Sequence, residues 1–149
     1  MRHAAAALVL LTAALSVSAT PMEWRGSRGW GPGGPYARHY DPHSVVTVRG
    51  EVLAVESFAT TGMSPGAHVT LRAAQETLSV HLGPEWYIST QDTTIEPGDT
   101  IEVTGSRATV DGKPVVIAAE VVKGDQLLRL RDDRGFPAWA GWRHREPRG

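Results

Sequence analysis

The sequence VVTVRGEVLAVESF, residues 45–58, sets the architecture of this chain. Val46, Val48 and Val52 fall on one parity of an extended strand, whereas Leu53 and Val55 fall on the other. Because side chains alternate strictly between the two faces of a strand, a straight strand cannot bury both sets. Gly50 stands just before the switch, where a bulge or coil lets one strand serve two sheets. The segment therefore predicts the long, bent first strand of a small barrel.

A β-hairpin is predicted over residues 68–82. If Gln75 and Glu76 form a two-residue turn, each apolar residue of one strand meets an apolar residue of the other. The predicted pairs are Ala73 with Leu78, Leu71 with Val80, and Val69 with Leu82. The opposite face then holds the polar residues His68, Thr70, Arg72, Ser79 and His81. Gln-Glu is a poor type I′ turn, so a loop one residue longer is the alternative.

A short helix and a second hairpin are predicted next. Pro84 followed by Glu85 favours a helix that covers one end of the barrel with Trp86 and Ile88. Further along, Asp111-Gly112 is a strong hairpin signal.

The second hairpin requires an irregularity. Pairing Val110 with Lys113 places Val103 opposite Glu120, so that an apolar side chain meets an acid. One extra residue near Gly105 removes this mismatch, and we predict a bulge there.

The order of these elements predicts an all-β fold. We expect a five- to six-stranded, partly open barrel of the oligonucleotide/oligosaccharide-binding (OB) type with one short helix, and residues 126–131 supply the short sixth strand. A split sandwich is the alternative. The predicted organisation is a signal peptide over 1–19, a Gly/Pro-rich flexible arm over 20–43, the OB-like barrel over 44–132 and a Trp/Arg-rich tail over 133–149.

Residues 1–19 have the pattern of an export signal. A positive start at Arg2 precedes an apolar run over 4–15, and small residues up to Ala19 form a cleavage site. The run is shorter than the roughly 20 apolar residues that span a bilayer. We therefore expect a periplasmic or secreted protein, cleaved near Ala19, with no membrane span after cleavage. An uncleaved N-terminal anchor is the alternative.

Composition narrows the chemistry and the partners. Cysteine is absent, which excludes disulfides, thiol redox chemistry and thiolate metal ligands. Residues 44–128 carry five Lys/Arg against eleven Asp/Glu, a net charge of −6, whereas residues 129–149 carry six Arg against three acids, a net charge of +3. An acidic barrel repels phosphate backbones, so we expect no nucleic-acid partner.

Three residues form a candidate metal site. His68 and His81 fall on one face of the first hairpin as diagonal neighbours, and Met63 lies in the loop before it. Imidazole and thioether are soft ligands that suit Cu(I), and the nearby Trp86 would cover the ion. The chain resembles small periplasmic OB-barrel copper carriers in export, size and ligand types, although it lacks a Met-x-Met pair. Two surface histidines on the polar face of a hairpin are the alternative.

The tail contains a candidate partner-binding element. Phe136, Trp139 and Trp142 recur at three-residue spacing and are flanked by arginines, including Arg143. An exposed element of this composition favours a protein partner over a membrane. The same aromatic residues would alternatively fold back and cover an open end of the barrel.

No catalytic pattern is found in the sequence. There is no Gly-x-Ser-x-Gly motif, no cysteine nucleophile and no glycine-rich loop before a helix. The glutamates are spread along the strands, as on a solvated barrel surface. We therefore expect a protein that is not an enzyme and requires no cofactor, with copper as the one candidate ion.

Three segments carry a resemblance to a known family. They are YDP at 40–42 leading into VTVRGEV at 46–52, VHLGPEWY at 80–87, and residues 98–107 from Gly-Asp to VTGSR. With the tail up to Trp139, they resemble the barrel domain of the magnetosome proteins MamS and MamX, and more distantly bacterial OB-fold stress proteins. The likeness covers about residues 40–143. MamX also carries haem-binding Cys-x-x-Cys-His motifs, which this cysteine-free chain does not share.

The leading hypothesis is an exported, non-enzymatic OB-fold binding or assembly module in the cell envelope. It would act on a protein partner or small ligand through the barrel face or the Trp-rich tail. The alternative is a periplasmic copper-binding or carrier protein that uses His68, His81 and Met63.

Overall fold

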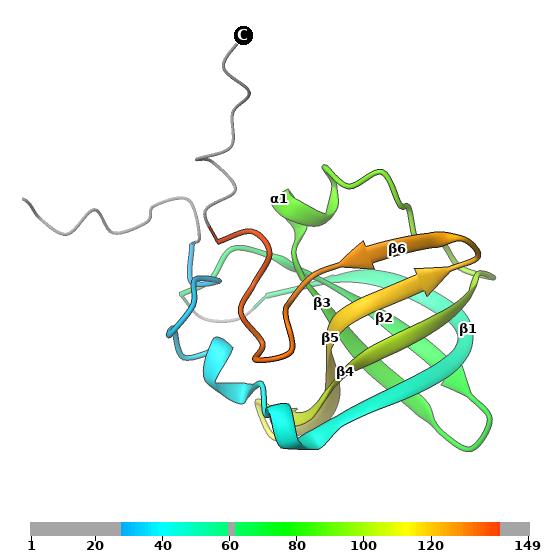
Figure 1. Ribbon diagram of the computed structural model, residues 1–149, viewed down its shortest axis with the longest axis horizontal. Helices are drawn as coiled ribbons and strands as arrows, with labels where there is room; N and C mark the ends of the chain where they lie inside the picture. The colour runs from blue at the N-terminus through cyan, green and yellow to red at the C-terminus, as the bar shows by residue number, and fades with distance from the viewer. Residues whose placement is uncertain (1–27, 60–61, 141–149) are drawn as a thin grey trace, which may run out of the picture.

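The computed structural model describes residues 28–59 and 62–140, and these form a six-stranded sheet that closes on itself (Figure 1). The strands are β1 (Val45–Phe58), β2 (Gly66–Ala73), β3 (Thr77–Pro84), β4 (Thr100–Val110), β5 (Lys113–Lys123) and β6 (Gln126–Arg129). The helix α1 (Glu85–Ile88) lies between β3 and β4, and two 3₁₀ turns, Ala37–His39 and Pro42–Ser44, precede β1.

The strand order confirms the OB-type barrel. The sheet order is β3-β2-β1-β4-β5-β6, and an additional parallel pairing of β3 with β5 closes the first five strands. All other pairings are antiparallel. The described residues thus form one closed sheet with an appended sixth strand, and the split sandwich is not formed.

β1 serves two neighbours, as its sequence predicts. Residues 45–51 pair with β4 and residues 50–58 pair with β2, so that Gly50 belongs to both ladders. A Cβ on Gly50 would collide with the carbonyl oxygen of Arg72 and lie 3.0 Å from Cγ of Leu71. The register shift lies at Leu53, three residues after Gly50. Glycine therefore permits the close approach, while the bulge changes the parity of the pairing. The expectation that the second apolar set is buried is wrong, because Leu53 and Val55 are both exposed.

The register of the first hairpin differs from the predicted one. Leu71 pairs with Leu78 and Val69 pairs with Val80. The backbone N–H of Ala73 donates to the carbonyl of Glu76 at 2.9 Å, so the turn is centred one residue earlier than predicted. Moving the centre by one residue shifts every pair by two, which leaves the buried and exposed faces unchanged.

The second hairpin is confirmed in detail. Asp111 and Gly112 have φ values of 51° and 75°, as a type I′ turn requires. The register shifts beside Gly105, where Ala119 is the extra residue, and this places Val103 opposite Val121. The predicted bulge therefore keeps an apolar pair in the core.

The helix α1 is confirmed, but it buries a different residue. Tyr87 is buried, whereas Trp86 and Ile88 are half-buried against the core. A one-turn helix presents only one side chain fully to the barrel. Fully buried apolar residues from all the strands of the closed barrel form the core, including Val52, Leu71, Val80, Ile101 and Ile117.

The segment before β1 is not a flexible arm where the structure describes it. In residues 28–43, Trp30, Tyr36 and Tyr40 are buried. The N–H of Asp41 donates to Oγ of the buried Ser106 at 2.9 Å, which joins the segment to β4. The Gly/Pro content indicated a linker, but burial of three large aromatic rings outweighs it. The proposed signal peptide lies outside the described residues.

We predict that Gly50→Val lowers the free energy of unfolding by about 2–4 kcal/mol, because its side chain would force the β1 and β2 backbones apart. Thr109→Val, at an exposed strand position, serves as the control and is expected to change stability by less than about 0.5 kcal/mol. Urea unfolding of both variants measures the difference. Wild-type stability of Gly50→Val would contradict the account of the bend.

Candidate binding site

A buried arginine lies where the two ends of the described chain meet. Nη1 of Arg131 donates to the carbonyls of Leu82 at 3.0 Å and Ala118 at 2.6 Å. These carbonyls belong to β3 and β5, directly after the short parallel pairing that closes the barrel. Burial lowers the pKa of the Arg131 guanidinium, but arginine starts so high that the group stays charged. Arg131 thus bridges the closing strands by hydrogen bonds.

Two carbonyl oxygens and an aromatic face stabilise the charge of Arg131, whereas its Nη2 is buried without a hydrogen-bond partner among the described residues. Its guanidinium carbon lies 4.8 Å from the centre of the Trp139 ring, which is cation–π geometry. Within residues 28–59 and 62–140, no carboxylate forms an ion pair with it. Arg131 therefore fixes the position of Trp139 against the barrel.

Trp139 joins the two ends of the described chain. Its Nε1 donates to the carbonyl of Trp30 at 2.9 Å, and the two rings meet edge to face. The Trp139 ring also lies against Gly83, where an added Cβ would approach it to 2.9 Å. Only 5% of Trp139 is exposed.

The expectation that Trp139 is an exposed partner-binding residue is therefore wrong. The aromatic ring is needed to cover the end of the barrel, which was the alternative interpretation of the tail. Phe136 differs, because 51% of it is exposed. Trp142 and Arg143 lie outside the described residues.

His81 is part of a buried aromatic cluster. Its Nδ1 lies 2.8 Å from the hydroxyl of Tyr36, and the Phe58 ring stacks on it at 4.3 Å between centroids. Burial, followed by the nearby His68 and Arg131, lowers the pKa of His81 to about 4. Burial also raises the pKa of Tyr36. At neutral pH both groups are neutral, and the Tyr36 hydroxyl shares a hydrogen bond with Nδ1 of His81 whose direction depends on the His81 tautomer.

The structure brings together two of the three predicted metal ligands. His68 and His81 are directly paired across β2 and β3, with ring centroids 6.1 Å apart, because the turn is centred one residue early. Nε2 of His68 lies 3.4 Å from Glu56, while its Nδ1 is buried without a hydrogen-bond partner in the described structure. Met63 packs beside Gly29. Among the residues that the structure describes, no three His, Cys, Asp or Glu side chains are grouped to hold a metal ion.

A hollow of about 790 Å³ opens between the barrel and the C-terminal segment, and we call it the C-terminal hollow. Its apolar lining comes from Tyr40, Pro42, Val45, Ala119, Phe136, Pro137, Ala138 and Ala140. Its polar lining comes from Thr104, Glu120, Arg129, Arg131, Asp132 and Asp133. A mostly apolar hollow of this size with a few polar groups is typical of ligand and peptide sites.

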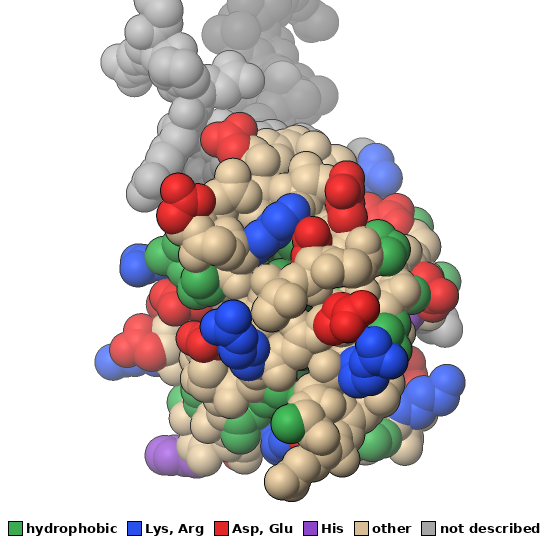
Figure 2. All heavy atoms as spheres, turned by 90° about the vertical axis from the view of Figure 1, so that its right-hand side faces the viewer, with side chains coloured by type: hydrophobic (Ala, Val, Ile, Leu, Met, Phe, Trp, Pro, Cys, Tyr) green, Lys and Arg blue, Asp and Glu red, His purple; other side chains and the backbone are tan. Residues whose placement is uncertain are grey.

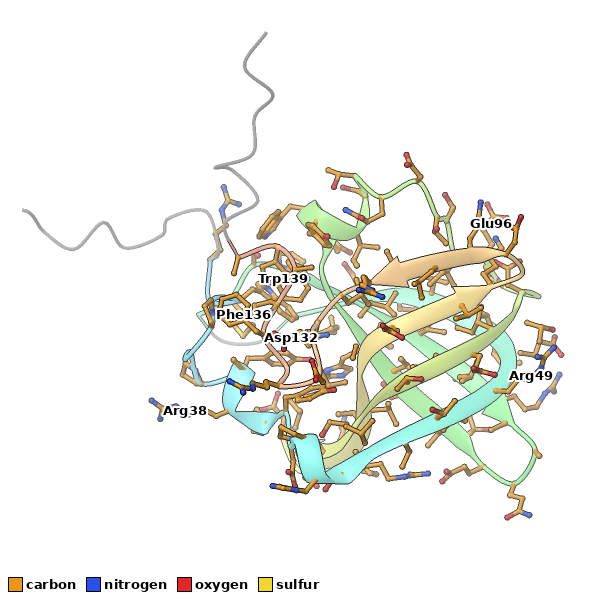
Figure 3. All side chains as sticks on the ribbon, in the orientation of Figure 1. Arg38, Arg49, Glu96, Asp132, Phe136 and Trp139 are labelled. Atoms are coloured by element: carbon orange, nitrogen blue, oxygen red, sulfur yellow. The ribbon has the colours of Figure 1, made fainter. Side chains whose placement is uncertain are left out.

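Figure 3 shows where side chains of the C-terminal segment lie relative to other surface residues. Asp132, Phe136 and Trp139 lie together beside the barrel, whereas Arg38, Arg49 and Glu96 project away from it. On the face shown in Figure 2, acidic and basic side chains are interspersed and the apolar ones form small separate areas. The hollow is therefore the better candidate for binding.

Sequence reasoning missed Trp30, Tyr36 and Arg131. A signal for the first two was present, since three large aromatic residues are more than a flexible linker needs. Glycines at positions 66 and 83 are a second signal, because aromatic rings lie against both backbones. Arg131 follows the fully buried Leu130, but nothing in the sequence shows which carbonyls it reaches.

Comparison with known proteins identifies a family whose model matches this chain and a solved structure with a remotely similar fold. The model of the MamS/MamX magnetosome protein family matches residues 44–128. One similar solved structure is the S. pombe Stn1–Ten1 complex, with 18% identity, coverage of 78% of this chain and 88% of that chain, and a TM-score of 0.40. No curated protein matches. In residues 28–59 and 62–140, no helix combines the length and apolar character needed to cross a bilayer.

We predict an acid-sensitive stability that depends on His81. Its pKa is about 4 in the folded protein against 6.5 for the free side chain, so the unfolded chain binds more protons between these values. The stabilisation is complete above pH 6.5 and is lost as the pH falls towards 4, by up to about 3 kcal/mol. Urea unfolding from pH 7 to pH 4 measures this loss.

The matched control for this experiment is His81→Gln, which cannot titrate in this range. Its free energy of unfolding should fall less steeply between pH 6.5 and pH 4 than that of the wild type. Equal slopes for the two proteins would show that His81 does not carry the effect.

Proposed function

The chain belongs to the MamS/MamX magnetosome protein family, and we propose that it is an exported, non-enzymatic binding module that serves the magnetosome in the cell envelope. In this proposal the OB-type barrel is a scaffold, and a protein partner is held at the C-terminal hollow. The signal-like pattern of residues 1–19 supports export. The absence of a catalytic sequence motif supports binding over catalysis.

The main observation in support of the proposal is that the aromatic side chain of Phe136 is exposed at the mostly apolar C-terminal hollow. Large apolar side chains that stay exposed beside a concave surface are frequent anchors of protein interfaces. The turn that presents Phe136 is rigid, because Oδ1 of Asp132 accepts from the N–H groups of Arg134 and Phe136 at 2.9 and 2.8 Å. A preformed anchor loses little conformational entropy on binding.

A second candidate function is copper binding. It is favoured by the direct pairing of His68 and His81 and by the buried, unpartnered Nδ1 of His68. A soft ion on two imidazoles and the Met63 thioether would satisfy that nitrogen. This function requires His81 to keep one nitrogen available beside its contact with Tyr36.

The first test places a photo-crosslinking phenylalanine analogue at position 136 in the bacterium that encodes the protein. We expect a mature chain that begins at Thr20, located in the periplasmic fraction, and one discrete cross-linked partner after irradiation. The same analogue at Leu53, an exposed position on β1, is the matched control and should give no adduct. A cytoplasmic, uncleaved chain, or identical products from both positions, would refute the proposal.

The copper function predicts saturable binding of one Cu(I) ion. His68→Ala and Met63→Leu should each weaken the affinity about tenfold or more, since each removes one ligand. His43→Ala, at an exposed position outside the barrel strands, is the control and should leave the affinity unchanged. Competition with a chromophoric Cu(I) chelator measures all four proteins. Equal affinities would exclude these ligands.

A further inference from the structure

β6 is an edge strand with backbone groups that no other described segment uses. In the described part of the chain it pairs only with β5, and Lys123 and Gln126 flank a two-residue turn in which Gly124 has a φ of 61°. In such a hairpin the flanking pair exchanges both hydrogen bonds, and so does every second pair after it. Val121 and Leu128 are that next pair. The N–H and C=O groups of Leu127 and Arg129 therefore point away from β5.

The unused edge is short and well defined. Within the described residues, no hydrogen bond outside the β5 ladder uses the backbone of Leu127 or Arg129. Beyond Arg129 the edge is covered, because the N–H of Ala138 donates to the carbonyl of Leu130 at 2.8 Å and Pro137 bridges Arg131. The free edge therefore ends where the C-terminal segment begins.

The side chains of Leu127 and Arg129 on this edge are respectively apolar and paired with an acid. Leu127 is 50% exposed and lies opposite Val122, which is 37% exposed. Arg129 lies 3.5 Å from Glu120 in an ion pair, and both residues line the C-terminal hollow. Natural proteins often protect an edge with an unpaired lysine or a proline, and β6 contains neither. The edge thus adjoins the hollow, and the one charge on β6, at Arg129, is paired with Glu120.

We propose that the outer edge of β6 receives an extended segment of a protein partner as an added strand. The inference rests on the proposed function, because it names how that partner is held. An extended peptide backbone presents alternating N–H and C=O groups, which are the complement of those on Leu127 and Arg129. One apolar side chain of the segment enters the C-terminal hollow beside Phe136, and Leu127 packs against the next side chain on that face.

The experiment selects peptides from a phage-displayed library of random dodecapeptides on the full-length protein. The most enriched peptide is synthesised, and its affinity is measured by fluorescence polarisation. Leu127→Pro removes one outward N–H without removing a hydrogen bond to β5, and an edge strand tolerates proline. We expect affinity to fall about tenfold or more for Leu127→Pro and for Phe136→Ala, with unchanged melting temperatures. Leu53→Lys, remote in the sheet, is the control and should bind as the wild type does.

A second measurement leaves the protein unaltered. The selected peptide is N-methylated at alternate residues in two versions, one for each edge of the extended backbone. Binding that survives in one version and is lost in the other supports strand addition. Equal binding of both versions overturns it.

The remaining outcomes separate the two proposals. If the selected peptides bind wild type and Leu127→Pro equally, strand addition at β6 is overturned while the binding module stands. If no peptide is enriched, both fail. If sedimentation shows a dimer that Leu127→Pro dissociates, the edge receives a second copy of this chain and the proposed occupant is wrong.

Discussion

The closure of this barrel depends on a buried positive charge that has carbonyl oxygens and an aromatic ring around it. β3 and β5 share only two register pairs, so their parallel contact is the weakest join in the closed sheet. Arg131 lies at the end of that join and donates to one carbonyl from each strand. A buried charge is costly unless it is hydrogen-bonded, and because Nη2 has no partner in the described structure, the two bonds of Nη1 strongly constrain the geometry around the charge. The position of the C-terminal segment, and with it the hollow, follows from that constraint.

The sequence predicted the parts of the fold that follow from local rules. Strand parity located the bend of β1, the Asp111-Gly112 turn located the second hairpin, and a single apolar–acid mismatch located the bulge at Gly105. The same rules misplaced the first hairpin by one residue, because no strong turn sequence fixes its register. Parity survived that error, which is why His68 and His81 still share a face.

The candidate site was much harder to predict. Phe136 was identified from its spacing, but whether a nearby aromatic is exposed or buried depends on contacts between segments about a hundred residues apart. Trp139 is buried because Trp30 and Arg131 contact it, and neither contact has a local signature in the sequence. The free edge of β6 was also not predictable from the sequence. It follows from which residues of β6 form hydrogen bonds with β5, and from the position of Pro137 and Ala138 beyond its end. Local sequence patterns therefore predict the strands and turns, whereas the candidate site forms only when segments far apart in the sequence pack together.

The hydrogen bond between Trp139 and Trp30 joins residues 109 positions apart. Contacts with such a large sequence separation carry a high loop-closure entropy, so they form late in folding and slow it. A chain that emerges N-terminus first cannot make this contact until Trp139 has emerged. Completion of the barrel therefore waits for the segment around Trp139, and a product that stops before this residue would keep its aromatic core open to solvent. Quality control by proteolysis would recognise such an unfinished molecule directly.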